Sequence, residues 1–226
     1  KKRTKNTLNL NEQSLGNKDM ASLAQYEKLD GVVSLSLRNN QFDYHGVQDL
    51  ASSPYLKNLT SLNLMNNAVG DKGLLLLAES PNLSQLEYLN LENTGITALG
   101  ILALSQSPHL SRLKELNLSG NDLREKGLRI LAESGNFKNL VKLRISGVPV
   151  GDSGFLALVH SNTLSQLEEL EAMGNTITRK SLDSMTTASK LARLKKLDLR
   201  RNKLKEADLI FLADTPTFQA LEALRF

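Results

Sequence analysis

Leucines recur along this chain with a period of 27 residues. The stretch LKNLTSLNLMNNAVGDKGLLLLAESP, residues 56–81, shows the unit: an alternating apolar pair, a polar turn and an apolar run. Alternation predicts a strand whose leucines face inward and whose neighbours face outward. The pair occurs nine times in register, at Leu8/Leu10, Leu35/Leu37, Leu62/Leu64, Leu89/Leu91, Leu116/Leu118, Leu143/Ile145, Leu170/Ala172, Leu197/Leu199 and Leu224/Phe226. A register kept without insertion or deletion predicts a repeating structure.

The second half of each repeat predicts a helix. The residues twelve and fifteen positions after the first leucine are apolar, and an i, i+3 pair marks one face of a helix. These pairs are Val47/Leu50, Leu74/Leu77, Ile101/Leu104, Leu128/Leu131, Phe155/Leu158, Leu182/Met185 and Leu209/Leu212. Proline ends several helices, at Ser53-Pro54, Ser80-Pro81, Ser107-Pro108 and Thr215-Pro216. Apolar residues then anchor the return loop, at Leu56, Leu83, Leu110, Phe137, Leu164, Leu191 and Phe218.

The combined pattern L-x-x-L-x-L-x-x-N-x-L, with LTSLNLMNN and GDKGLLLLAES, resembles the ribonuclease-inhibitor-like class of leucine-rich repeat proteins. The resemblance implies an α/β fold: a leucine-rich repeat solenoid, or horseshoe, with a concave parallel sheet and convex helices. Residues 1–226 would form one domain of about eight repeats. The vertebrate inhibitors are rich in cysteine and this chain has none, so it looks more like bacterial members, including effectors that intracellular pathogens deliver into host cells.

The chain stops inside a predicted strand, at residues 224–226, without a polar cap. An uncovered terminal repeat exposes its core. We therefore expect that the natural protein continues beyond Phe226, or that another chain associates with this uncapped end.

Two sets of equivalent positions in the repeats, which we call columns, leave alternatives open. The family asparagine stands at Asn40, Asn67, Asn121, Asn175 and Asn202, where it can satisfy backbone groups. Val148 replaces it in one repeat, so this turn should be solved differently, as a tolerated defect or as a reshaped binding edge. In the helices, large and small residues alternate through Leu76, Ala103, Ile130 and Ala157, which indicates either interdigitating helices or, with Phe211, a convex binding patch.

Composition narrows the function. The 226 residues carry a net charge of +4, too modest to indicate nucleic-acid binding by itself. Cysteine is absent, which removes disulfides and thiol chemistry. Neither an apolar run of membrane-spanning length nor a signal peptide is visible. We expect no membrane insertion and a cytoplasmic location, or translocation into a host-cell cytosol.

No catalytic constellation is visible, and we expect no enzyme activity, cofactor or metal. His45, His109 and His160 fall in different columns, so stacking does not bring them together. The glycines at 46, 73, 100, 127 and 154 share one structural column at the helix start. Ran GTPase-activating proteins also resemble this fold and use a loop arginine. Arg38 and Arg200 follow strands here, but every loop has the same short length. The alternative to a binding protein is therefore a GTPase regulator or the recognition part of a larger enzyme.

The concave strand surface is the predicted site for a protein partner. Its N-terminal half is neutral, with Asn9, Ser36, Asn63, Asn90 and Asn117 in one column. Its C-terminal half is charged, and the predicted partner-binding residues are Lys142, Arg144, Glu169, Glu171, Lys196, Asp198, Arg200 and Arg201. Alternating signs on neighbouring strands could instead stabilise the protein itself. Arg200 and Arg201 are expected to add unmatched positive charge. Reversing both to glutamate should weaken partner binding in a salt-dependent way and barely change folding.

Overall fold

A computed structural model describes residues 6–188, 190–213 and 221–226. Nine short strands form one parallel sheet in chain order. The strands are β1 (Thr7–Asn9), β2 (Ser34–Ser36), β3 (Ser61–Asn63), β4 (Tyr88–Asn90), β5 (Glu115–Asn117), β6 (Lys142–Arg144), β7 (Glu169–Glu171), β8 (Lys196–Asp198) and β9 (Ala223–Arg225). The helices of the described residues are α1 (Asn17–Ala24), α2 (Tyr44–Ser52), α3 (Gly70–Ala78), α4 (Ala98–Ser105), α5 (Arg124–Glu133), α6 (Gly151–Val159), α7 (Arg179–Ala188) and α8 (Glu206–Ala213).

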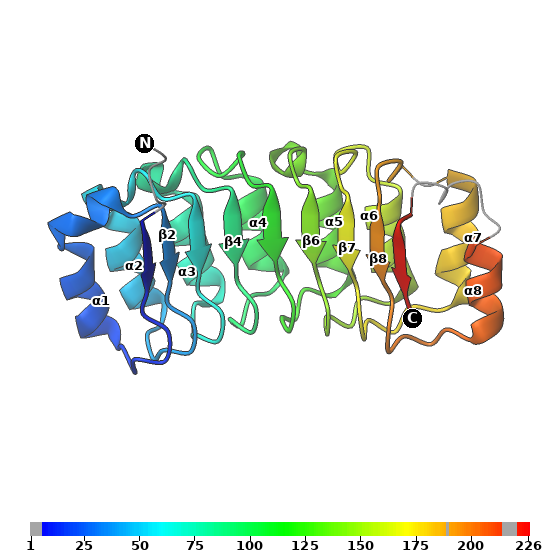
Figure 1. The fold of residues 1–226 in the computed structure, drawn as a ribbon, viewed down its shortest axis with the longest axis horizontal. Coiled ribbons are helices and arrows are strands. Elements are labelled where there is room, and N and C mark those ends of the chain that lie inside the picture. Colours follow the sequence, from blue (N-terminus) through cyan, green and yellow to red (C-terminus); the bar gives the residue numbers. More distant parts are fainter. Residues whose placement is uncertain (1–5, 189, 214–220) are drawn as a thin grey trace.

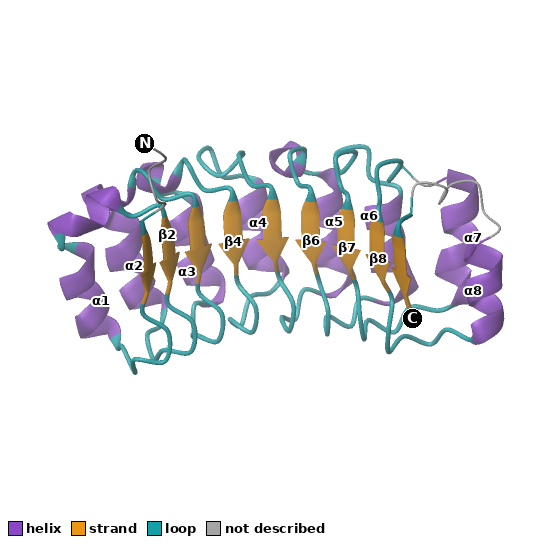
Figure 2. Ribbon diagram, viewed as in Figure 1, coloured by secondary structure: helices purple, strands orange, loops and turns teal. Residues whose placement is uncertain are grey.

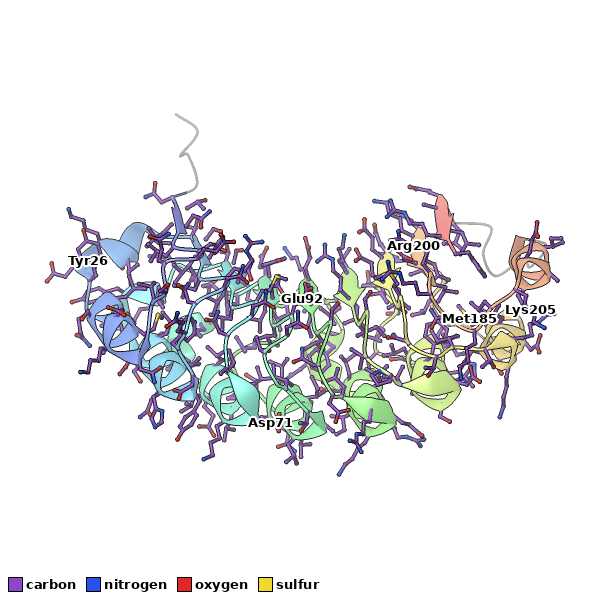
Figure 3. The ribbon with its side chains drawn as sticks, turned by 90° about the horizontal axis from the view of Figure 1, so that it is seen from below. Tyr26, Asp71, Glu92, Met185, Arg200 and Lys205 are labelled. Carbon is purple, nitrogen blue, oxygen red and sulfur yellow. The ribbon has the colours of Figure 1, made fainter. Side chains whose placement is uncertain are left out.

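The molecule is a curved two-layer solenoid. Strands line one side and helices the other (Figures 1 and 2), and the view of Figure 3 shows the sheet on the inner side of the arc. Each strand pairs with the next at a 27-residue offset, for example Leu62 with Leu89. The second leucines and the helix columns form one continuous core, in which Leu64, Leu74 and Leu77 are fully buried. The predicted leucine-rich repeat fold is confirmed.

The asparagine column forms the expected hydrogen-bond ladder behind the strands. Asn67 Nδ2 donates to the carbonyls of Leu37 and Leu64, at 2.9 and 3.0 Å, and its Oδ1 accepts the Asn40 N–H at 3.1 Å. Each such amide therefore joins two repeats. Asn175 departs from the ladder: its Oδ1 accepts the N–H of Val148, but its buried Nδ2 has no partner in the described part of the chain.

The expectation that the Val148 turn needs another solution is wrong. Gly147 and Gly151 have positive φ, of 68° and 62°, and Val150 N–H donates to the Val148 carbonyl at 2.7 Å. The third repeat has the same arrangement, with positive φ at positions 66 and 70 and a bond from residue 69 to residue 67. The backbone turn is thus conserved between these repeats, and only the side-chain amide is lost.

A second ladder, which the sequence analysis missed, joins the convex-side loops. Its members are serines eighteen positions after the first leucine, and each hydroxyl donates to a carbonyl 29 residues earlier. The serines are Ser53, Ser80, Ser107, Ser134 and Ser161. The serine recurs in five successive repeats of the sequence, but the sequence alone indicates only that helices end there.

Side chains at the helix starts also link neighbouring repeats. Asp71 accepts hydrogen bonds from the N–H groups of Thr97 and Gly100, at 2.8 and 2.9 Å. A Cβ built on Gly100 would lie 2.6 Å from Asp71 Oδ1, so glycine permits this approach. These contacts give the glycine column its structural role.

Several sequence predictions lie outside the described residues. They are the Thr215-Pro216 helix end, the Phe218 loop anchor, and the side chains of Leu209, Phe211 and Leu212.

Candidate protein-interaction surface

The charged residues predicted for partner binding lie together on strands β6 to β8 and the turn that follows β8. A hollow of about 290 Å³ opens between these strands and β9. Six of the eight predicted residues line it: Lys142, Glu169, Glu171, Lys196, Asp198 and Arg200. Arg144 lies beside this group and contacts Glu171, whereas Arg201 lies on the turn beyond the strand. We call the concave surface formed by β6–β9 the charged half.

Glu169 lies at the centre of an ion-pair network. Its carboxylate contacts the ammonium groups of Lys142 and Lys196, the latter at 2.6 Å. These hydrogen bonds lower the pKa of Glu169 to about 2, because both lysines favour its ionised form more than partial burial disfavours it. Arg144 Nε binds Glu171 at 3.1 Å and extends the network. Self-stabilisation, the first of the two sequence interpretations, therefore has a direct structural basis.

The expectation of unmatched charge is wrong for Arg200 and stays a prediction for Arg201. Arg200 binds Asp198 with its Nη2 at 2.6 Å, and this contact lowers the pKa of Asp198. Asp198 is 8% exposed, so reversing Arg200 would set two carboxylates together in a half-enclosed site. Arg201 is exposed and has no ion pair with the described residues. That reversal barely changes folding therefore stays a prediction for Arg201, whereas for Arg200 a cost to folding is expected.

The neutral half, which is the concave surface of β1–β5 apart from Glu115 of β5, uses its asparagines differently. Asn63 Oδ1 accepts the N–H of Met65 at 3.0 Å, and Asn117 does the same for Ser119. Asn90 follows the same pattern. These contacts hold the turn of their own repeat, and Asn117 Nδ2 also donates to Glu92 of the preceding repeat at 2.9 Å. In the charged half, Asp198 keeps the local contact with the N–H of Arg200, whereas Arg144 and Glu171 pair between repeats.

The helix position at which large and small residues alternate packs between neighbouring helices, as the first of its two interpretations predicts. Leu76, Ile130 and Ala157 are partly buried against the core. The exposed large apolar side chains of the described helices are instead Leu75, Leu99, Leu102 and Ile210, at 44%, 63%, 38% and 64%.

Groups with possible chemistry lie apart or are engaged elsewhere. No cluster of three or more histidines, aspartates or glutamates in the described ranges could hold a metal ion. Arg38, considered as a GTPase-activating arginine, binds Glu12 at 2.6 Å, and Arg200 binds Asp198. His45 contacts Asp43 at 3.0 Å and is exposed.

Three basic residues near the charged half were not predicted as site residues. Arg225 lines the hollow from β9. Lys203 and Lys205 lie on the turn after β8 and are exposed. The sequence could have indicated the two lysines, because their two repeat positions hold small, neutral or acidic residues in most other repeats.

Comparison with known proteins agrees with the fold. Residues 55–78 and 109–132 match the leucine-rich repeat family model. These two stretches are similar to that family, and the structure repeats the same strand-and-helix unit over residues that the family model does not match.

The crystal structure of an internalin (inlF) from Listeria monocytogenes is similar to this chain, with a TM-score of 0.65 and 21% sequence identity. The match covers 98% of this chain and 54% of the internalin chain, so this chain spans about half the length of that structure. At this identity the likeness concerns the fold alone. No curated protein matches the chain. In the described residues, no helix is long and apolar enough to cross a membrane.

Proposed function

We propose that this chain is a recognition module that binds a partner protein through the charged half of its concave face. The observation that carries the proposal is the hollow between β6 and β9, which gathers side chains of both signs from neighbouring strands. A curved sheet of stacked repeats offers the extended concave surface that solenoid proteins use for binding. The two signs favour a protein surface of mixed charge as the partner.

Because these charges are already paired with each other, they favour selective binding of a matching protein surface over binding of any anion. Lys142 and Glu169 are held by each other and are both less than a quarter exposed in their side chains. A partner would have to match this fixed pattern, since an unpaired charge buried at an interface is costly. Lys196, Arg200 and Arg225 at the more open end are the groups on which a partner's carboxylates could act.

The proposal also includes the subclass of the fold, its source and its place of action. The Ser-Pro helix ends and uniform period support a bacterial leucine-rich repeat protein of the ribonuclease-inhibitor-like class, acting on a host protein in the cytosol. A helix in each described repeat from the first to the eighth agrees with that class. The engagement of Arg38 and Arg200 by carboxylates gives the GTPase-regulator alternative no support.

Affinity capture with matched variants tests the proposal. Lys196→Gln with Arg225→Gln removes two cations that line the hollow, while Lys18→Gln with Lys57→Gln removes two exposed cations far along the chain. The first pair should reduce capture of the partner in a salt-dependent way, and the second pair should not. Equal capture by both variants would reject the concave surface. Loss of capture only on changing Leu75 and Leu99 to serine, with the fold intact, would assign binding to the convex helices.

A further inference from the structure

The turn after β8 differs in charge from the turns after the other strands. Positions four, six and eight after the first leucine are Arg201, Lys203 and Lys205 in this repeat, and all three side chains are exposed. We call these residues the basic turn. The same positions in the earlier repeats hold Glu12, Ser14, Gly16, Asn39, Gln41, Asp43, Asn66, Ala68, Gly70, Asn93, Gly95, Thr97, Gly120, Asp122, Arg124, Gly147, Pro149, Gly151, Gly174, Thr176 and Thr178. Arg124 is the one basic residue among them, and it binds Asp122 at 3.0 Å.

The cations of the basic turn have no ion-pair partner in the described residues, unlike others nearby. Lys195 binds Glu168 at 2.7 Å, and Lys196 and Arg200 are paired as described above. Two carboxylates lie close to the turn in sequence. Asp208 accepts the backbone N–H of Lys205 at 2.8 Å and binds Arg179 at 2.9 Å, whereas Glu206 is exposed. Positive charge therefore exceeds negative charge at this edge.

Arg201 has a backbone conformation that arginine disfavours. Its φ is 56°, and position four has positive φ in every repeat from the first to the eighth. Six of these eight positions hold glycine or asparagine, which adopt that conformation most readily. Glu12 is the other exception, and its carboxylate binds Arg38. Arg201 lacks such a contact, and a strained residue without an internal partner points to an external one.

We propose that the basic turn docks an acidic segment of the partner protein. This inference rests on the proposed function, and it adds the chemistry of one part of the partner. The three cations lie within residues 201–205 of one turn, which suits a short acidic segment; alternate residues of an extended peptide are at most roughly 7 Å apart. The view of Figure 3 looks onto this edge and shows Arg200 at the sheet and Lys205 near the helices. The turn thus leads from the hollow toward the flank of the solenoid.

A nucleic acid fits this surface less well. A nucleic-acid backbone needs positive charge along a track and stacking partners for its bases. The corresponding positions of the two preceding repeats are uncharged, and residues 200–208 contain no aromatic side chain. Among these three repeats, positions four, six and eight are charged in one turn alone, which suits a short run of carboxylates.

Binding of a fluorescein-labelled hexaglutamate peptide to the whole chain, followed by anisotropy at about 50 mM salt, tests the inference. The variant R201N/K203Q/K205Q should weaken binding about tenfold, as expected for the loss of three exposed charge contacts. Asparagine at 201 keeps the left-handed backbone accessible, so the fold should survive. The control K18Q/K57Q/K126Q removes the same charge at exposed positions elsewhere and should bind like the original chain.

Several results would overturn the inference. Among them are no preference for hexaglutamate over hexaglutamine, an equal loss in the control, and tighter binding of an oligouridylate of similar length through the same three residues. If K196Q/R225Q abolished peptide binding and the basic-turn variant did not, the hollow would be the anion site. The inference would then fail while the proposed function stood. If the peptide bound at the basic turn but no change in the concave surface affected protein capture, the proposed function would fail instead.

Discussion

The two halves of the concave face share one backbone and differ in what their side chains bind. In the neutral half, Asn63 and Asn90 hydrogen-bond to the turn of their own repeat. In the charged half, Lys142, Arg144 and Glu169 bind residues of neighbouring repeats. The comparison shows that outward positions can be reassigned from local turn support to contacts between strands without altering the strand register.

The largest expected loss of stability comes from core substitutions, which test whether the two halves have an equivalent core. Leu62→Ala in the neutral half and Leu170→Ala in the charged half each remove a buried side chain. Each should lower the free energy of unfolding by about 2–5 kcal/mol, because a cavity remains. Chemical denaturation measures both. A cost below about 1 kcal/mol for only one of them would contradict an equivalent core.

Acid should destabilise the charged half through Glu169. The pKa of Glu169 is lowered from 4.5 to about 2, so its stabilising contribution is complete above pH 4.5 and is lost as pH falls toward 2. The contribution is about 1–3 kcal/mol. Denaturation curves measured between these pH values should show this loss, and Glu169→Gln should remove it. Glu79→Gln, at an exposed helix end, serves as the control. An unchanged acid profile in Glu169→Gln would show that the network does not stabilise the fold.

The asparagine ladder allows reciprocal changes in the two halves. Asn67→Val should cost about 1–3 kcal/mol, because it leaves carbonyls and the Asn40 N–H unsatisfied in the interior. Val148→Asn should stabilise the fold by up to about 1 kcal/mol, since the backbone turn is the same. Thermal and chemical unfolding measure both. Lower stability of Val148→Asn would show that the valine packing in this repeat outweighs the missing amide.

The smallest expected effect concerns the left-handed position that both halves contain. Arg201→Asn should raise the free energy of unfolding by less than about 1 kcal/mol, because asparagine tolerates positive φ better. Asn66→Arg should lower it in the neutral half, and by more, because it also removes the hydrogen bonds of Asn66 with Asn39 and Asn93. If Arg201→Asn were destabilising, Arg201 would have a structural role, and its proposed part in binding would need another explanation.

The sequence predicted the repeat, the inward leucines and the two halves of the concave face, because these follow from spacing alone. A period of 27 residues without a gap determines which side chains stack. The same logic placed the charged residues on neighbouring strands, where six of them line one hollow. The identity of the partner does not follow from spacing, since outward positions do not fill the core.

Only the tertiary structure decided which charges are paired and which are free. Arg200 and Arg201 are adjacent in sequence, yet one binds Asp198 and the other extends from a left-handed turn. The lost amide at Val148 suggested a different turn, but the backbone there has the turn of the third repeat, which keeps its asparagine. The reason is physical: periodicity fixes the order in which repeats stack, whereas ion pairs and turn conformations depend on distances and torsion angles that arise only when the repeats pack together.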